Sequence, residues 1–272
     1  RPAAAAALAA RLGGRAAALD ELESAGSGLL LIAVADGAVR EVAGRLARRP
    51  QAPVALHTAG ALGASALTAL ADAGSATGGF HPLQAFPRPL AEPAPGTFFA
   101  LDGGPAALEL GRRLAAAFGG TAGVVPESAR ELYHLAASVA GGGVATLVAS
   151  AADLARRLEL PAGVARGYLE LARGALAEMA RGAEGARAEA GDPGRGLAGT
   201  ITGPVARGDF ATFLREVERL RSAPGEAAGG RLELYCRLAL ETVRLTRGAP
   251  DAERLARALG GGGFLDPPGG GC

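Results

Sequence analysis

Three histidines are the residues best suited to move protons in this sequence. His57 follows a short apolar run in PVALHTAG, His81 follows another in GGFHPLQAF, and His134 lies in the helical stretch ELYHLAAS. The ordinary pKa of histidine lies near neutral pH, so a positioned imidazole can act as a general acid or base. Each of the three could instead make only a structural hydrogen bond at a turn or cap. Both interpretations stay open for each histidine, and convergence on one cleft would favour chemistry.

Polar neighbours of the first two histidines could bind a ligand. Thr58 and Gly60 lie in the turn after His57, where a hydroxyl and free backbone N–H groups could hold a carboxylate or a cofactor ribose. Thr58 could equally cap the helix that we expect near Gly60. Gln84 lies in the apolar loop after His81. We therefore take these residues, with both histidines, as candidate substrate ligands.

Two further segments carry candidate ligands. Asp36, with Val34 and Ala35, follows the apolar run LLLIAV and could touch the ribose of a bound cofactor, or Asp36 could cap the next helix. Arg207 lies in the turn-rich segment LAGTITGPVARGDF and could bind an anionic substrate with two hydrogen bonds. The alternative for Arg207 is a bridge to Asp209 that fixes the loop.

Composition narrows the function classes. The 28 basic and 27 acidic residues give a net charge of +1, which removes the electrostatic case for nucleic acid or a polybasic membrane anchor. Every basic residue is Arg, so lysine Schiff-base chemistry is excluded. Two cysteines and three histidines without a C-x-x-C motif predict no disulfide framework and no metal site. No apolar run approaches 18 residues, so we expect no membrane span and a cytoplasmic protein, and the Ala-, Gly- and Arg-rich composition indicates a bacterial source.

The first 125 residues alternate between helical and strand-like segments. Helical spacing covers residues 3–12, 38–48, 61–71 and 105–118, and apolar runs at 29–34, 53–56, 76–80, 97–101 and 121–125 read as strands. Such alternation favours a parallel, doubly wound α/β sheet. The run 29–34 is continuous, which is typical of a strand buried on both faces.

The pattern changes after Pro126. Helical segments are expected at 127–158, with a bend at Gly141–Gly143, and at 164–181, 210–220, 231–247 and 251–259, with a loop at 181–196 and Asp209 as an N-cap. We therefore predict domains at 1–125 and 126–260, followed by a disordered Gly/Pro tail at 261–272.

A parallel sheet that begins with a helix is unusual. A Rossmann domain opens with a strand and a G-x-G-x-x-G loop that holds the pyrophosphate at a helix N-terminus. The nearest pair here, Gly13-Gly14, follows a helix. Since residue 1 is Arg and not Met, we expect that a first βαβ unit of roughly 30 residues precedes this chain.

Four segments together resemble a known family. HTAGALGASAL, GGFHPLQAF, ELYHLAAS and ITGPVARGD resemble marker segments of bacterial proteins that join a Rossmann-like domain to DUF2520, and the match runs from about residue 3 to about residue 247. That family is similar in architecture to pyrroline-5-carboxylate reductase and to the 6-phosphogluconate and 3-hydroxyisobutyrate dehydrogenases. The resemblance implies a truncated Rossmann-like domain, an all-α 6-phosphogluconate-dehydrogenase-like domain that mediates homodimerisation, and NADP (or NAD) as cofactor.

The resemblance also suggests residue roles. His134 with Ser138 falls where 3-hydroxyacid dehydrogenases carry a catalytic Lys and, one turn on, an Asn, so we take His134 as the candidate general acid or base and Ser138 as a substrate ligand. Arg1 matches the point after the second strand, where an Arg often meets the 2′-phosphate of NADP. Relatives tend to carry Ser-Asn where Gly141-Gly142 stand here, which puts substrate orientation in question.

These observations give a leading hypothesis and two alternatives. The first is an NAD(P)-dependent oxidoreductase for a small carbonyl, imine or hydroxy acid. The second is a non-catalytic, homodimeric module that binds a nucleotide or metabolite. The third is a structural homodimer without a ligand.

Overall fold

The computed structural model describes residues 2–22, 27–86, 94–188, 193–222 and 229–259. Internal contacts divide the chain into two compact units, Arg1–Val144 and Ala145–Cys272. The domain limits of 1–125 and 126–260, which come from the change of sequence pattern after Pro126, stay a prediction. The tail at 261–272 lies outside the described residues.

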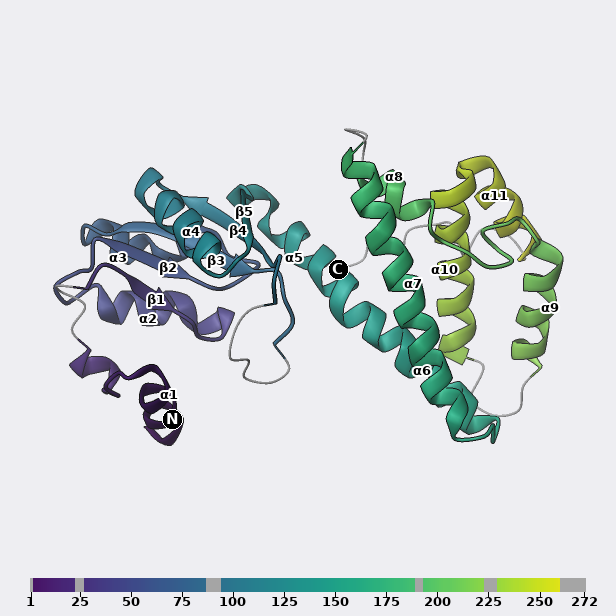
Figure 1. Cartoon of the computed structure of the whole chain (residues 1–272), viewed down its shortest axis with the longest axis horizontal. Helices are drawn as coiled ribbons and strands as arrows, with labels where there is room; N and C mark the ends of the chain where they lie inside the picture. The colour runs from purple at the N-terminus through teal and green to yellow at the C-terminus, as the bar shows by residue number, and fades with distance from the viewer. Residues whose placement is uncertain (1, 23–26, 87–93, 189–192, 223–228, 260–272) are drawn as a thin grey trace. The chain divides into compact units, whose positions relative to one another are not determined.

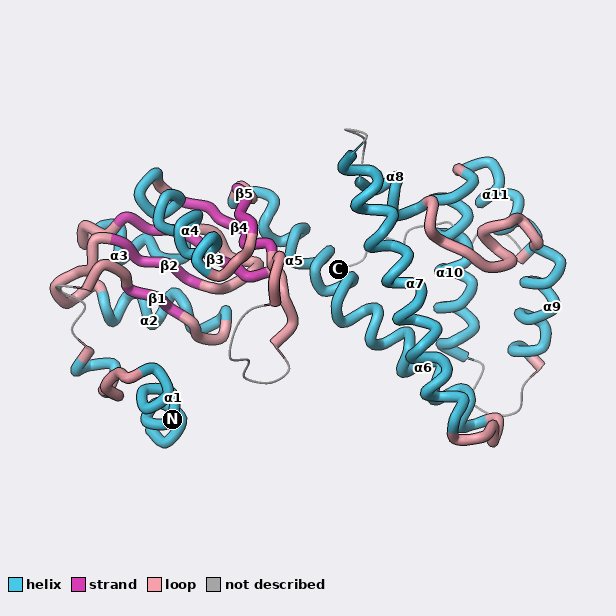
Figure 2. The backbone as a smooth tube through the Cα atoms, in the orientation of Figure 1, coloured by secondary structure: helices cyan, strands magenta, loops and turns pink. Residues whose placement is uncertain are grey.

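The first unit is built on a five-stranded sheet whose strands are ordered as in the sequence (Figures 1 and 2). The pairs β1–β2, β2–β3 and β4–β5 are parallel. Helices and strands alternate, so the predicted α/β, Rossmann-like class is confirmed. The strands are β1 (Leu30–Ile32), β2 (Val54–His57), β3 (Ala76–Pro82), β4 (Phe98–Gly103) and β5 (Thr121–Val124).

One pair departs from the expected parallel sheet: β3 and β4 are antiparallel, with Phe80 opposite Leu101. A parallel return requires a crossover, which is usually a helix. The described residues between these strands, 83–86 and 94–97, contain no helix. The chain therefore turns back, and β4 runs opposite to β3.

Helices cover both faces of the sheet. The first unit contains α1 (Pro2–Leu12), α2 (Val39–Leu46), α3 (Thr68–Asp72), α4 (Pro105–Ala117) and α5 (Arg130–Ser138). Side chains of β2 alternate between two cores, as the period of two in a strand requires. Ala55 packs with α2 and α3, whereas Val54 and Leu56 pack with α4. Figure 1 shows α2 and α4 on opposite sides of the strands.

Strand β1 differs from the expected strand buried on both faces. Leu30 and Ile32 are buried beneath α2, but Leu31 between them is 47% exposed. Helix α4 packs on β2, β3, β4 and β5 and leaves this face of β1 open. Among the described strands, β1 pairs only with β2 and forms one edge of the sheet.

The second unit is helical throughout its described residues. It contains α6 (Val144–Arg157), which begins at the last residue of the first unit, α7 (Gly163–Ala188), α8 (Pro193–Ala198), α9 (Phe210–Arg221), α10 (Gly229–Arg247) and α11 (Ala249–Ala258). Phe213, Val217, Cys236, Val243 and Leu255 form its core between α9, α10 and α11. The predicted N-cap of α9 is confirmed, because Asp209 accepts a hydrogen bond from the backbone N–H of Thr212 at 3.1 Å.

The loop predicted at 181–196 is largely wrong. Helix α7 continues to Ala188 and α8 begins at Pro193. The stretch is rich in Ala, Glu and Arg, which are strong helix formers, and their summed propensity outweighs the cost of Gly182 and Gly185. The glycines in this stretch therefore do not end the helix.

A single helical segment runs from Glu127 to Arg157 and includes α5, a π-helical turn at Val139–Gly143 and α6. Three consecutive glycines occupy the π-helical turn, which lies where the sequence predicted a bend. By length and composition this 31-residue helix could cross a membrane, with a mean hydropathy of 1.6 over its most apolar window. Length and composition alone do not place this helix in a membrane, so the expectation of no membrane span stays a prediction.

Candidate active site

The carboxyl ends of β1, β2 and β3 meet at one edge of the sheet because these strands are parallel. His57 ends β2, and His81 lies one residue before the end of β3. The backbone N–H of Thr58 donates to the carbonyl of Ile32 at 3.2 Å, which holds the exits of β1 and β2 together. In open α/β sheets, ligands bind at this edge.

A buried ion pair fixes the start of α5 against the sheet. Arg130, which is fully buried, places its Nη2 3.3 Å from Oδ1 of Asp102 and donates to the carbonyl of Ala100 at 3.2 Å. Asp102 also accepts backbone hydrogen bonds from Gly79 at 2.6 Å and from Ala64 at 3.0 Å. One carboxylate thus ties together β3, β4, α5 and the segment after β2.

Gly79 is required for this arrangement. A Cβ at this position would lie 2.4 Å from Oδ1 of Asp102 and 2.9 Å from Nη2 of Arg130. Any side chain would push both charged groups away from the sheet. The GGF part of the motif GGFHPLQAF therefore makes room for the ion pair.

The segment after β2 is held from both sides. His57 is fully buried, and its Nε2 lies 3.0 Å from the carbonyl of Gly63, to which it donates. Burial lowers the pKa of His57. On the other side, Ser65 donates to the carboxylate of Glu127, and a Cβ on Gly63 would lie 2.3 Å from the Glu127 side chain. These contacts give His57 a structural hydrogen bond.

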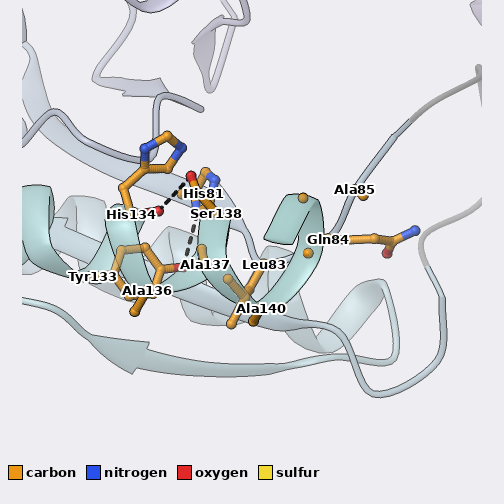
Figure 3. Close-up of a pocket in the computed structure, with 12 residues that line it drawn as sticks. His81, Leu83, Gln84, Ala85, Tyr133, His134, Ala136, Ala137, Ser138 and Ala140 are labelled. Atoms are coloured by element: carbon orange, nitrogen blue, oxygen red, sulfur yellow. Dashed lines mark hydrogen bonds between the residues drawn. The ribbon is translucent and has the colours of Figure 1, made fainter. Parts of the chain in front are cut away.

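A pocket of about 600 Å³ lies between the loop that follows β3 and the helix formed by α5 and the π-helical turn (Figure 3). In this view the two histidines lie together at one end, and Gln84 lies at the other. The pocket is lined by His81, Leu83, Gln84, Ala85, Tyr133, His134, Ala136, Ala137, Ser138, Ala140, Gly141 and Gly142.

The polar end of the pocket is built from three rings. The Tyr133 hydroxyl lies 2.9 Å from Nδ1 of His81, and the ring of His134 lies edge-on to that of His81 at 5.8 Å between centroids. Gly60 lies directly behind them, where a Cβ would be 2.3 Å from Cδ2 of His134 and 2.8 Å from Nε2 of His81. The absence of a side chain at Gly60 thus lets the two histidines meet.

Both hydrogen-bonded groups of this trio are neutral at pH 7. Burial, together with the neighbouring His134 and Arg130, lowers the pKa of His81 to about 4. Burial raises the pKa of Tyr133, so its hydroxyl keeps its proton. When Tyr133 donates to Nδ1, the proton of His81 must lie on Nε2. His81 can then donate a hydrogen bond from Nε2.

The structure brings together five of the candidates expected from the sequence: His81, Gln84, His134 and Ser138 line the pocket, and Gly60 touches both histidines. Ser138 donates to the carbonyl of His134 at 3.0 Å. The side-chain oxygen of Gln84 accepts from Ala94 at 3.0 Å and from the Thr97 hydroxyl at 2.8 Å, and so anchors the loop.

The other candidates lie elsewhere. His57 is buried beneath the Gly60–Gly63 segment, and half-buried Thr58 is not among the residues that line the pocket. Val34, Ala35 and Asp36 are exposed after β1. Arg207 belongs to the second unit, and Arg1 lies outside the described residues.

The described part of the chain contains no cluster of three or more His, Cys, Asp or Glu residues that could hold a metal ion.

Sequence reasoning missed Tyr133, Asp102 and Arg130. Tyr133 immediately precedes His134, and successive residues on a helix point about 100° apart, so both were not expected in one pocket. Both side chains line the pocket because the ring of His81 contacts each of them. A charged residue directly before Gly103-Gly104, and an Arg one turn before the histidine, were the available signals for the ion pair.

The family model described as "Domain of unknown function (DUF2520)" matches residues 97–242, more than half of the chain. The chain belongs to the DUF2520 family. The matched region starts at β4 and includes Asp102, Arg130, Tyr133 and His134. No protein of curated function matches the chain.

Several solved structures share the fold of this chain. Protein TM1727 of Thermotoga maritima is 22% identical, with a TM-score of 0.64 over 90% of this chain and 87% of that one. A "putative NADP oxidoreductase" of Bacteroides fragilis is 19% identical, with a TM-score of 0.64 over 89% and 85%. A "putative oxidoreductase" of Pseudomonas putida is 18% identical, with a TM-score of 0.60 over 91% and 86%. At these identities the likeness shows the Rossmann-like fold.

We predict that Asp102→Ala destabilises this DUF2520 protein by about 3–5 kcal/mol, because it leaves the fully buried Arg130 without its counter-ion. Replacing Arg130 by Met in the same chain should restore part of the loss. Urea unfolding measures both. Glu170→Ala, which removes an exposed pair with Arg173, is the control and should cost less than about 1 kcal/mol. An Asp102→Ala cost as small as the control would contradict the assigned role.

His81 should make stability depend on pH in a defined window. Its pKa is about 4 in the folded protein and 6.5 in the unfolded chain, so between these values the unfolded chain binds one more proton. Stability should fall as pH drops from 6.5 to 4 and be fully present above 6.5. The slope from this group is at most about 1.4 kcal/mol per pH unit. Subtracting the unfolding curve of His81→Gln isolates it, and identical pH profiles for the two proteins would disprove it.

Proposed function

We propose that this DUF2520 protein is an NAD(P)-dependent oxidoreductase that acts on a small carbonyl, imine or hydroxy acid. The observation that carries this proposal is the meeting of His81, Tyr133 and His134 in one pocket beside the carboxyl ends of parallel strands. A Rossmann-like sheet places cofactors at this edge. The similar Bacteroides fragilis structure, described as a "putative NADP oxidoreductase", supports the same class.

The described residues fit one end of a dinucleotide. The exposed segment Ala33–Asp36 after β1 and the backbone of Thr58 after β2 would lie along the ribose nearest the pocket. The Gly60–Gly63 segment cannot hold a pyrophosphate, because His81, His134 and Glu127 fill the space beside its glycines. The expected strand and glycine-rich loop before Arg1 stay a prediction, as does the contact of Arg1 with a 2′-phosphate.

We assign separate chemical roles to the residues of the pocket. NADP in its reduced form, when bound, supplies a hydride to the carbonyl carbon. His134 is the proposed general acid that delivers a proton to the carbonyl oxygen, and the general base in the reverse direction. The neutral His81, with its tautomer set by Tyr133, is the proposed donor that polarises the same oxygen from Nε2. An anion-binding role for Arg207 stays a prediction.

The test uses the full-length protein. NADPH at 100 times its Kd should stabilise the fold by about 2.7 kcal/mol in a melting experiment. His134→Ala should lower turnover of a carbonyl substrate by about 10²–10⁴-fold and leave NADPH binding unchanged. Full turnover by His134→Ala would remove it from the catalytic role. Tight NADPH binding without turnover of any carbonyl would favour the alternative, a non-catalytic binding module.

We also propose that a second copy of the chain covers the apolar side of α5. Leu132, Leu135 and Val139 follow the i, i+3, i+7 spacing of one helix stripe and are 71%, 59% and 63% exposed. Such a stripe marks an interaction surface. The ion pair between Asp102 and Arg130 joins the same helix to the sheet and its apolar core, which favours a protein partner over lipid.

Sedimentation of the purified protein tests this partner. The wild type should sediment as a dimer, and Leu135→Glu with Val139→Glu should sediment as a folded monomer, because two charges would be buried in the interface. A matched variant with charge on exposed Leu171 controls for net charge. A monomeric wild type, or one that partitions into lipid vesicles, would overturn the proposal.

A further inference from the structure

The pocket wall beyond the histidines is made of small apolar residues. Tyr133, Ala137 and Gly141 follow one another at intervals of four residues, and Ala136 and Ala140 flank them on the same helix side. All five line the pocket. Beyond the Tyr133 hydroxyl, this wall offers methyl groups and bare backbone for contact.

The opposite wall is also apolar. Leu83, which is 41% exposed, and Ala85 line the pocket from the loop after β3. Gln84 lies at the end away from the histidines, and its side-chain oxygen is already engaged by Ala94 and Thr97. His81, Tyr133 and His134 form the polar end of the pocket, where the Ser138 hydroxyl is bonded to the carbonyl of His134, and the amide group of Gln84 lies at the opposite end.

The glycines of the π-helical turn leave space in this wall. A Cβ on Gly141 or on Gly142 would meet no protein atom within 4 Å, whereas the same atom on Gly60 would collide with both histidines. A side chain at position 141 would therefore occupy open space beside the pocket without moving neighbouring atoms. π-Helical turns occur frequently at functional sites.

We propose that this pocket selects an uncharged carbonyl or imine compound with an apolar substituent of several carbons. The polar atom faces His81 and His134, and the substituent lies along Ala137 and Gly141. A carboxylate on that substituent would lose its hydration against methyl groups, which disfavours acids of the same length. This inference rests on the proposed function and names its substrate class.

A matched ligand pair tests the selection. 2-Hexanone and 5-oxohexanoate are methyl ketones of the same chain length, and they differ only at the far end of the chain, in a methyl group against a carboxylate. We expect at least tenfold tighter binding and tenfold higher kcat/KM for 2-hexanone. Binding is followed by chemical-shift changes of the His81 ring, which require no turnover. Within the methyl ketones, each buried methylene should contribute roughly fourfold, so 2-hexanone should exceed 2-propanone by about 60-fold.

Gly141→Leu tests the position of the chain. It should abolish most of the 60-fold gain from chain length, so that 2-hexanone binds little better than 2-propanone. Gly167→Leu is the matched control, because Gly167 lies in α7, a Cβ there also meets nothing within 4 Å, and the residue does not line the pocket. It should bind both ketones as the wild type does.

The outcomes separate the two proposals. Binding of the ketone over the acid without turnover would sustain the selection and overturn the oxidoreductase function. Turnover with preference for the acid would overturn the selection and sustain the function. Equal loss for both ketones in Gly141→Leu would contradict the assigned chain position. No binding and no turnover would overturn both proposals.

Discussion

The ion pair between Asp102 and Arg130 is the interaction on which the site depends. Both side chains are buried, and the carboxylate also accepts backbone hydrogen bonds from β3 and from the segment after β2. A buried pair adds little to stability compared with apolar residues of the same size, but losing one partner is costly. Its structural result is specific: the first turn of α5 is fixed at the strand exits, so Tyr133 and His134 follow at set positions beside His81.

One helix then serves two surfaces. The side with Tyr133, Ala137 and Gly141 forms the pocket wall, and the side with Leu132, Leu135 and Val139 is exposed. The two sets interleave at helical spacing, which is why the segment has a continuous apolar composition. These two surfaces account for the apolar composition of the first half of the Glu127–Arg157 helix.

The sequence predicted the fold more completely than the site. Short apolar runs located the strands and helical spacing located most helices, because burial leaves a direct trace in the order of residues. The antiparallel turn of β4 left no such trace, since strand direction depends on the connection and not on the strand. Among the candidates, His81 and His134 lie together at the pocket, while His57 lies under the loop, where it donates a hydrogen bond to the carbonyl of Gly63. Tyr133 was missed because its role exists only once His81 lies against α5.

Nitrogen-15 NMR of the histidine rings shows whether Tyr133, held by α5, fixes the tautomer of His81. With the His81 signal assigned by its loss in His81→Gln, the account predicts one neutral tautomer at pH 7, protonated on Nε2, and titration near pH 4. In Tyr133→Phe the proton of His81 should exchange between Nδ1 and Nε2, because Nδ1 loses its hydrogen-bond donor. A wild-type His81 that averages between both tautomers and titrates near pH 6.5 would show that α5 does not hold Tyr133 against it, and the account of the site would be wrong.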